Sequence, residues 1–277
     1  MAKYDAMGDK IQRRVPIAVW IMLIGLVVGI TGLIWCLNTD LKKYTKTENL
    51  CTDQTTDNVK NLDFEFDNAK VKIAASSDDQ IHVNIEDAAE GVYSYGEKDG
   101  KFYIHRKRSF GILKFSGMSS IPFLKDVYPQ AKITVEIPSG ISLDKVELDC
   151  AMSDITAEGI KCEKLDIDNG MGSLKLRDIE AEKTVIDNGM GKIDAKDCTF
   201  GNTDIDNGMG SIDMNGCVLE DTDIDNGMGS VDISIDRDGE DYRVSGDADV
   251  KGKTGSKNAD YKIKVDNGMG SVDIRFR

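Results

Sequence analysis

The chain has few aromatic residues, few prolines and almost no histidine. Phe, Trp and Tyr make up 6% of its 277 residues, and it contains four prolines and two histidines. Acid–base and nucleophilic catalysis most often depend on histidine, and here His82 and His105 both fall at outward positions of expected strands. There is no Gly-x-Ser-x-Gly elbow and no His-Glu-x-x-His helix. The sequence therefore predicts a protein that is not an enzyme and has no cofactor.

Positive charge is also in short supply. Lys and Arg total 35 against 49 Asp and Glu, which gives a formal net charge of -14. An acidic surface repels phosphate, so no nucleic-acid partner is expected. The 27 glycines gather in the C-terminal half, where they indicate tight turns between short strands and argue against long helices.

One uncharged stretch has the length of a membrane span. Residues 15–37 contain no Asp, Glu, Lys or Arg, and at about 1.5 Å per residue a helix of this length crosses a hydrocarbon core of roughly 30 Å. Trp20 and Trp35 lie near its ends, where indole rings favour the headgroup layer. We expect a cell-membrane protein with a cytoplasmic tail at 1–14, a single transmembrane helix at 15–37 and an extracellular C-terminal part.

Two features of this segment leave alternatives open. A cleaved signal peptide is the rival interpretation, but the bulky residues 34–37 do not form the small-residue site that cleavage needs. Gly25 and Gly29 form a Gly-x-x-x-Gly pattern that permits weak homodimerisation, although such glycines are also common in unpaired membrane helices.

A pentapeptide repeat dominates the C-terminal half. Asp-Asn-Gly-Met-Gly begins at positions 168, 187, 206, 225 and 266, and the first four copies are spaced by 19 residues. Asp149 opens a degenerate copy 19 residues earlier, and residues 242–250 have the alternation of a worn copy within the 41-residue gap before Asp266. A fixed period of this length predicts about seven stacked coils of a solenoid.

Aligning the copies gives three apolar columns. Because alternate residues of a strand share a face, these columns predict three inward-facing strands per coil. The first column is Leu148, Ile167, Ile186, Ile205, Ile224 and Val265; the second is Ile155, Leu174, Ile193, Ile212, Val231 and Val272; the third is Ile160, Ile179, Cys198 and Cys217, followed two residues later by Cys162, Ala181, Phe200 and Leu219. The fold class is therefore all-β, a single-stranded parallel β-helix or solenoid of about 19-residue coils, preceded by one transmembrane helix.

The repeated amides and glycines are expected to have structural roles. The asparagines can form an amide ladder at a bend, and the glycines on both sides of each methionine supply corners with positive φ. These residues are Asn169, Gly170, Gly172, Asn188, Gly189, Gly191, Asn207, Gly208, Gly210, Asn226, Gly227, Gly229, Asn267, Gly268 and Gly270.

Upstream of the repeat, residues 61–146 alternate without the pentapeptide. Segments such as 81–85 and 133–137 read as strands and are expected to form irregular opening coils that cap the regular repeats at 147–277. Residues 38–60 are expected to be a linker, polar from Cys51 onward.

The order of these strands resembles a known domain. Ile81-His-Val-Asn-Ile85, Lys101-Phe-Tyr-Ile104 and Ile133-Thr-Val-Glu-Ile-Pro-Ser-Gly140, followed by glycine-bearing strand repeats, resemble the bacterial putative-adhesin domain of unknown function over residues 61–277. The chain is also similar to membrane-anchored β-helical proteins of Firmicutes linked to cell-envelope stress. The resemblance implies a β-helical fold, an envelope location and no known catalytic residues.

Two outward columns of aspartate are candidate ion sites. One contains Asp168, Asp187, Asp206 and Asp225, and the other contains Asp194, Asp213, Asp232 and Asp273. A divalent cation such as Ca²⁺ would relieve their mutual repulsion, but the Gly-Gly-x-Gly-x-Asp pattern of calcium-binding β-rolls is absent. The alternative is a solvated acidic face that keeps the solenoid soluble and blocks lateral pairing of sheets.

The six cysteines show no zinc-site spacing and no Cys-x-x-Cys motif. Cys198 and Cys217 share an inward column on adjacent coils, so they are expected to be either two buried thiols or a disulfide. Cys150 stands where later coils carry asparagine, and it is expected to fill that bend.

Residues 106–128 interrupt the strand pattern with a basic start and an apolar continuation. This segment is expected either to cover the open end of the solenoid or to contact a partner. Its partner-binding candidates are Phe110, Ile112, Leu113, Phe115 and Phe123.

These features favour a non-enzymatic, membrane-anchored surface protein, an adhesin or envelope scaffold that binds a protein or cell-wall ligand. One alternative is a cell-envelope stress regulator that acts through a membrane partner. Another is a carbohydrate-active β-helix enzyme that uses paired carboxylates. Because every coil carries the same carboxylates, the sequence singles out no catalytic pair.

Overall fold

The computed structural model describes residues 47–55, 59–107, 130–255 and 258–276. The chain divides into two units, Met1–Lys46 and Thr47–Arg277, and only the second contains described residues. The expected membrane span at 15–37, including Gly25 and Gly29, lies outside them. Within the described ranges, no helix is both long and apolar enough to cross a membrane.

The second unit is almost entirely β-structure. Its strands belong to one hydrogen-bonded sheet, and the described helical structure is a single 3-10 turn at Gly239–Asp241. The strands of the repeat region are β7 (Leu143–Glu158), β8 (Lys161–Met171), β9 (Leu174–Arg177), β10 (Glu180–Met190), β11 (Ile193–Lys196), β12 (Thr199–Met209), β13 (Ile212–Leu219), β14 (Thr222–Met228), β15 (Val231–Ile235), β16 (Tyr242–Gly246), β17 (Asp249–Lys251), β18 (Tyr261–Met269) and β19 (Val272–Phe276).

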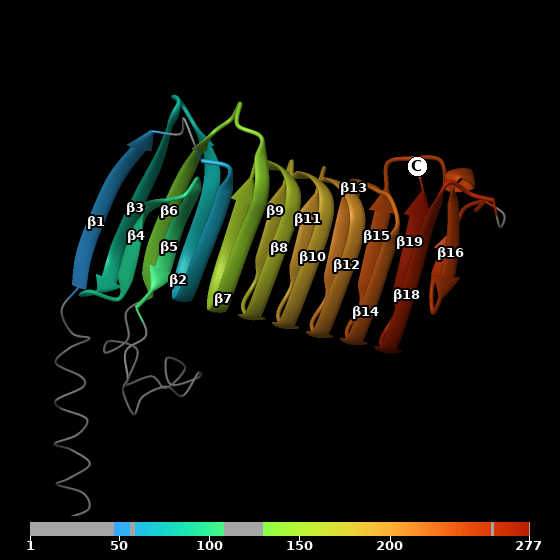
Figure 1. Cartoon of the computed structure of the whole chain (residues 1–277). Helices are drawn as coiled ribbons and strands as arrows, with labels where there is room; N and C mark the ends of the chain where they lie inside the picture. Colours follow the sequence, from blue (N-terminus) through green and yellow to red (C-terminus); the bar gives the residue numbers. More distant parts are fainter. Residues whose placement is uncertain (1–46, 56–58, 108–129, 256–257, 277) are drawn as a thin grey trace, which may run out of the picture. The chain divides into compact units, whose positions relative to one another are not determined.

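Successive coils pair in parallel and in register. Strands β8, β10, β12 and β14 lie side by side (Figure 1), and Ile167, Ile186, Ile205 and Ile224 are matched across them. The shorter strands β9, β11, β13 and β15 form a second parallel row. The 19-residue coil predicted from the sequence is therefore present.

Each of the first regular coils contains two strands, which corrects the prediction of three. The residues expected to form a separate third strand are the beginning of the long strand: Glu180 and Ala181 of β10 pair with Lys161 and Cys162 of β8. The expected third strand and the expected first strand are therefore one continuous strand in each coil. The backbone can bend between them and still keep its interstrand hydrogen bonds, which a turn would interrupt.

All three predicted apolar columns point into the core. Every residue of the three columns is buried, with at most 5% of its surface exposed. The core also contains a column that the sequence analysis missed, formed by Leu165, Thr184, Thr203, Thr222 and Ile263. Thr203 and Thr222 each donate a hydrogen bond to a carbonyl two residues earlier, which allows these hydroxyls to be buried.

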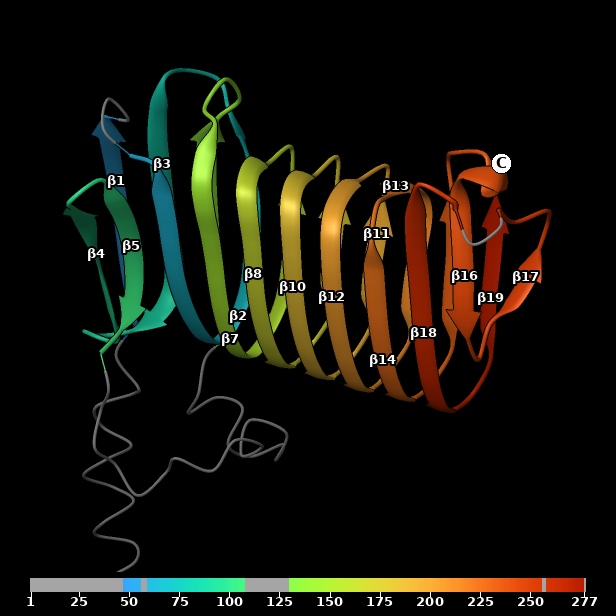
Figure 2. The same cartoon turned by 45° about the vertical axis from the view of Figure 1, so that its right-hand side comes forward.

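The last coils do not stack in sequence order. Strand β18 lies between β14 and β16 (Figure 2), and β15 and β17 both pair with β19. The copy that begins at Asp266 therefore stacks directly on the copy that begins at Asp225. The worn copy at 242–251 is the outermost coil, and the chain returns inward after it.

Aromatic side chains explain why the worn copy lies outermost. Tyr242 is fully buried and donates a hydrogen bond from its hydroxyl to the Leu219 carbonyl at 2.7 Å. Its ring centroid lies 5.5 Å from that of Tyr261 and 5.2 Å from that of Phe276. The Arg237 guanidinium covers Tyr261 at 4.7 Å. Terminal repeats of a solenoid must close its open core, and this cluster provides that closure.

The N-terminal half contains one complete coil and two sets of flanking strands. Strand β2 (Asn61–Ser76) pairs in parallel with β7 along most of its length. The first part of β2 also pairs with β5, and its second part pairs with β6. The flanking strands are β1 (Thr47–Thr55), β3 (Gln80–Ala89), β4 (Tyr93–Lys98), β5 (Lys101–Arg106) and β6 (Ala131–Pro138).

Antiparallel pairs in this half correct two further predictions. Strands β3 and β6 pair antiparallel, as do β4 and β5. The coils of a solenoid pair in parallel, so residues 61–146 form opening coils of the solenoid only in part. The predicted linker at 38–60 is wrong for residues 47–55, because these form β1, which pairs antiparallel with β3.

His82 connects β1 to the turn before β3 and predicts a pH dependence. Its Nδ1 lies 2.7 Å from an Asp53 carboxylate oxygen and its Nε2 lies 2.8 Å from one of Asp78. The hydrogen bonds with Asp53 and then Asp78 raise the pKa of His82. Because the pKa of His82 is higher in the folded protein, its protonated form stabilises the pairing of β1 with β3. This contribution is complete below about pH 6.5, the pKa in the unfolded chain, and is lost as the pH rises through the folded-state pKa.

We therefore expect the amides of β1 to exchange faster at pH 8.5 than at pH 6, after correction for intrinsic exchange rates. Hydrogen exchange of wild type and His82→Gln checks this, because the variant should lose most of the pH dependence. Equal pH dependence in both proteins would contradict the role of His82.

Candidate functional site

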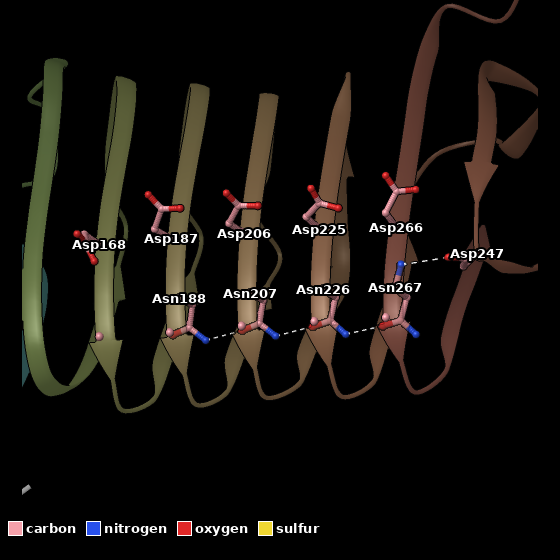
Figure 3. A pocket seen from close by; sticks show the side chains of 15 residues that line it. Asp168, Asp187, Asn188, Asp206, Asn207, Asp225, Asn226, Asp247, Asp266 and Asn267 are labelled. Carbon is pink, nitrogen blue, oxygen red and sulfur yellow. Dashed lines mark hydrogen bonds between the residues drawn. The ribbon is translucent and has the colours of Figure 1, made fainter.

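An open groove runs across the coils on the outer face of the long strands. In each pentapeptide the aspartate and the first glycine lie on the outer face, and the asparagine between them turns inward; it is buried in the first four copies and half-buried at Asn267. The glycines form the floor, and the row Asp168, Asp187, Asp206, Asp225 and Asp266 lines the groove (Figure 3). The groove has a volume of about 960 Å³, and Asp247 of the outermost coil lines its C-terminal end.

The two glycines of each copy serve different purposes, which corrects the prediction that both have positive φ. Gly210 has a φ of 149°, and a Cβ there would lie 1.7 Å from the Gly191 carbonyl oxygen of the preceding coil. Gly208 does not have a positive φ, but a Cβ would lie 2.7 Å from the Gly189 oxygen. The second glycine therefore allows the corner, and the first allows close stacking and leaves the groove floor bare.

The predicted asparagine ladder is present beneath the groove. Each amide donates to the side-chain oxygen of the next coil, at 2.7 Å from Asn169 to Asn188 and at 2.6 Å for the three following bonds, through Asn207 and Asn226 to Asn267. Figure 3 shows the ladder from Asn188 onward. Because the first four amides are buried and all five are bonded in series, they hold the strand edge beneath the aspartates in a fixed register.

The ladder ends abruptly at its N-terminal side. Cys150 occupies the position before Asn169, and the Asn169 Oδ1 atom is buried without a hydrogen-bond partner. The Cys150 side chain fills the bend, as predicted, but it leaves the first amide oxygen unsatisfied. Burial, followed by the charges of Asp149 and Asp168, raises the pKa of this thiol.

Four of the five groove aspartates have no basic partner among the described residues. Asp168, Asp187, Asp206 and Asp225 make no ion pair with a residue in the described ranges, whereas Asp266 contacts Lys264 at 2.5 Å. Burial, followed by the negative charges of Asp149 and Asp187, raises the pKa of Asp168. Burial, followed by the charges of Asp187 and Asp204, raises the pKa of Asp206. Stacking in register therefore concentrates negative charge along the groove.

The second aspartate column, in contrast, is matched by basic side chains. Each of its members has a basic neighbour: Asp194 lies 2.8 Å from Arg177, Asp213 lies 3.2 Å from Lys192, Asp232 lies 3.8 Å from Arg275 and Asp273 lies 2.6 Å from Lys251. The repeat pattern places the two columns alike, on outward faces. Their difference depends on which basic residues the neighbouring coils bring near, and the repeat pattern alone does not contain this information.

The groove aspartates do not converge on a single point. Each coil supplies one carboxylate, and in the described part of the chain no group of three or more His, Cys, Asp or Glu side chains is placed to hold a metal ion. Ca²⁺ takes about six to eight oxygen ligands. The arrangement is therefore better suited to an extended cationic ligand that contacts one carboxylate per coil than to a single calcium ion.

The paired cysteines of the third column are free thiols. Cys198 and Cys217 are buried, and their thiols donate to the carbonyls of Lys196 at 3.3 Å and Ala195 at 3.8 Å. A hydrogen bond with Cys198 and burial raise the pKa of Cys217. Both residues therefore pack as small core side chains in this structure.

One repeated residue has an exposure that the sequence analysis did not anticipate. The methionine between the two glycines was interpreted only as part of a corner, but Met190, Met209, Met228 and Met269 are 40%, 43%, 39% and 62% exposed. The signal was available, because a methionine at a glycine corner has no place in the three inward columns. The predicted docking residues Phe110, Ile112, Leu113, Phe115 and Phe123 lie outside the described residues.

Several solved structures are similar to the chain at low sequence identity. A "putative cell adhesion protein" from Clostridium sporogenes ATCC 15579 is 14% identical with a TM-score of 0.47, over 84% of this chain and 100% of that one. A "putative adhesin" from Bacteroides fragilis NCTC 9343 is also 14% identical with a TM-score of 0.47, over 83% and 98%. A "putative adhesin" from Parabacteroides merdae ATCC 43184 is 13% identical with a TM-score of 0.41, over 82% and 96%.

No curated protein matches the chain. A family profile does match, and it covers residues 59–277, which include the groove, the asparagine ladder and both ends of the stack. This match confirms the resemblance found in the sequence from residue 61 onward. The chain belongs to the Toastrack DUF4097 family.

Proposed function

We propose that this chain is a non-enzymatic surface protein, anchored through residues 15–37, that acts as an adhesin or envelope scaffold by binding extended cationic ligands in its groove. The observation that carries the proposal is the row of groove aspartates, of which only Asp266 has a basic partner among the described residues, set beside a floor of glycine. The bare floor lets an extended chain approach the backbone closely, and carboxylates about 4.8 Å apart can contact successive positive groups.

The repetition itself argues for binding and against catalysis. An enzyme needs one set of groups that differ in their environment and role. Here Asp187, Asp206 and Asp225 occupy equivalent positions on successive coils. Equivalent sites in a row suit a ligand that is itself repetitive, such as a basic polypeptide or an amine-bearing wall polymer. The stress-regulator alternative depends on the apolar segment around Phe110 and stays a prediction.

The experiment compares two triple variants of the full-length protein in detergent. Asp187→Asn/Asp206→Asn/Asp225→Asn removes three groove charges, and Asp194→Asn/Asp213→Asn/Asp232→Asn removes the same number from the other column. We expect the groove variant to bind poly-L-lysine at least tenfold more weakly in biosensor measurements, and the control variant to bind within about twofold of wild type.

The proposal also requires that intact cells or purified cell wall retain the wild-type protein more strongly than the groove variant. Equal weakening in both triple variants would mean that net charge alone attracts the polymer, and the groove would then have no specific role. Absence of retention on cells and wall would contradict the adhesin or scaffold function.

A further inference from the structure

A row of methionines runs along the corner next to the groove, and all but the first, half-buried member are exposed. Met171, Met190, Met209, Met228 and Met269 are paired in register on successive coils. We call these five residues the methionine ridge. Neighbouring strands are about 4.8 Å apart, so the ridge presents flexible thioethers at the same interval along the solenoid.

The ridge methionines are not part of the apolar core. The last four are between 39% and 62% exposed, whereas Met214 on the neighbouring row of strands is buried at 1%. These four are the exposed large hydrophobic residues in the described part of the chain. Apolar side chains that face inward stabilise the fold because they are removed from water. The exposed ridge methionines contribute little of this stabilisation.

The spacing of the ridge suits a metal ion held between coils. Metal–sulfur bonds are about 2.3 Å long, the value for zinc and thiolate, so two sulfurs on opposite sides of one ion lie about 4.6 Å apart. This separation is close to the distance of about 4.8 Å between neighbouring strands. Because methionine has three rotatable bonds before its methyl group, small adjustments can bring two or three sulfurs to one ion.

The chemistry of the ligands selects the kind of ion. Thioethers are soft ligands that favour ions such as Cu(I), whereas Ca²⁺ and Mg²⁺ prefer oxygen. The thioethers are neutral, so the positive charge of the ion must be balanced by nearby groups. The groove aspartates belong to the same pentapeptides and make no ion pair with described basic residues, Asp266 excepted. Their negative charge attracts the cation toward the ridge. They are not clustered in a way that would hold the ion themselves, because no group of three or more such ligands is found among the described residues.

We propose that the methionine ridge binds soft monovalent cations, Cu(I) or Ag(I), between the thioethers of adjacent coils. The site is distinct from the groove, and it does not depend on the groove's binding of a cationic polymer. The rigid asparagine ladder beneath the strands keeps successive methionines at constant spacing, so the stack offers several equivalent positions for the ion.

The test uses full-length protein in detergent with Cys36→Ser and Cys51→Ser in every sample, because Cys51 is exposed and Cys36 lies outside the described residues. Ag(I) is the first probe, since it needs no reductant, and it is added as the nitrate in chloride-free buffer. Methionine methyl groups labelled with ¹³C report binding residue by residue. We expect the methyl signals of Met190, Met209 and Met228 to shift on addition of Ag(I), and that of Met214 to stay unchanged.

Affinity is then measured for Met190→Leu/Met209→Leu/Met228→Leu and for the control Met214→Leu. Leucine has a similar volume and no sulfur, so the triple variant should fold and bind Ag(I) at least tenfold more weakly, and the control should bind as the parent protein does. Competition with a Cu(I) chelator under anaerobic conditions should rank the Cu(I) affinities of the three proteins in the same order, with the triple variant weakest.

Two results would overturn the proposal. One is unchanged affinity in the triple variant, or ridge signals that do not move. The other is loss of Ag(I) binding in the groove-aspartate triple variant while the ridge variant binds normally, because the carboxylates would then be the ligands. Failure of poly-L-lysine binding leaves these readouts unaffected, so the two proposals can fail separately.

Discussion

Gly210→Ala is expected to destabilise the solenoid by more than about 4 kcal/mol, a loss that exceeds most single substitutions. The residue has a φ of 149°, which side chains rarely adopt, and the new Cβ would lie 1.7 Å from the Gly191 carbonyl oxygen. Two adjacent coils would have to separate to relieve this contact, so the interstrand hydrogen bonds at the corner would lengthen. Chemical denaturation followed by circular dichroism measures the change in the free energy of unfolding.

Gly140→Ala is the matched control, because a Cβ at Gly140 has no atom within 4 Å. Its free energy of unfolding should stay within about 0.5 kcal/mol of wild type. Gly208→Ala should fall between the two, since its Cβ contact is longer and its φ is not positive. A Gly210→Ala variant as stable as Gly140→Ala would mean that the coils are not in close contact at this corner.

Asn207→Ala is expected to cost about 2–4 kcal/mol, because it removes two buried hydrogen bonds at once. Asn188 loses its acceptor and Asn226 loses its donor, and both remain buried. Asn202→Ala on the same strand is the control, since Asn202 is exposed and lies outside the ladder. Similar midpoints of denaturation for the two variants would contradict a stabilising role for the ladder.

The regular part of the fold could be predicted because its information is local and repeated. The 19-residue period, the apolar columns from Ile167 to Val265 and the asparagine ladder each follow from one coil copied onto the next. In-register parallel stacking requires identical residues to meet, so the sequence of one coil determines the contacts of its neighbours.

The site was only partly predictable. The sequence placed the groove aspartates and the second aspartate column in outward rows, but it did not reveal that every member of the second column has a basic neighbour while most groove aspartates have none among the described residues. Arg177 reaches Asp194 on the next coil, and Lys251 reaches Asp273 from a coil that lies outside its sequence order. Such pairs depend on side-chain reach across coils and on the order of the stack.

The sequence by itself determined the period, the inward faces and the glycine corners, because each is a consequence of strand alternation and backbone sterics within about 19 residues. Only the tertiary structure decided that β18 lies between β14 and β16, that residues 47–55 pair with β3, and that the methionines face outward at the corner. These features depend on competition between segments distant in the chain for the same strand edge and the same open core. Tyr242 settles that competition at the C-terminal end, since its buried ring and its hydrogen bond to Leu219 favour the worn coil as the cap.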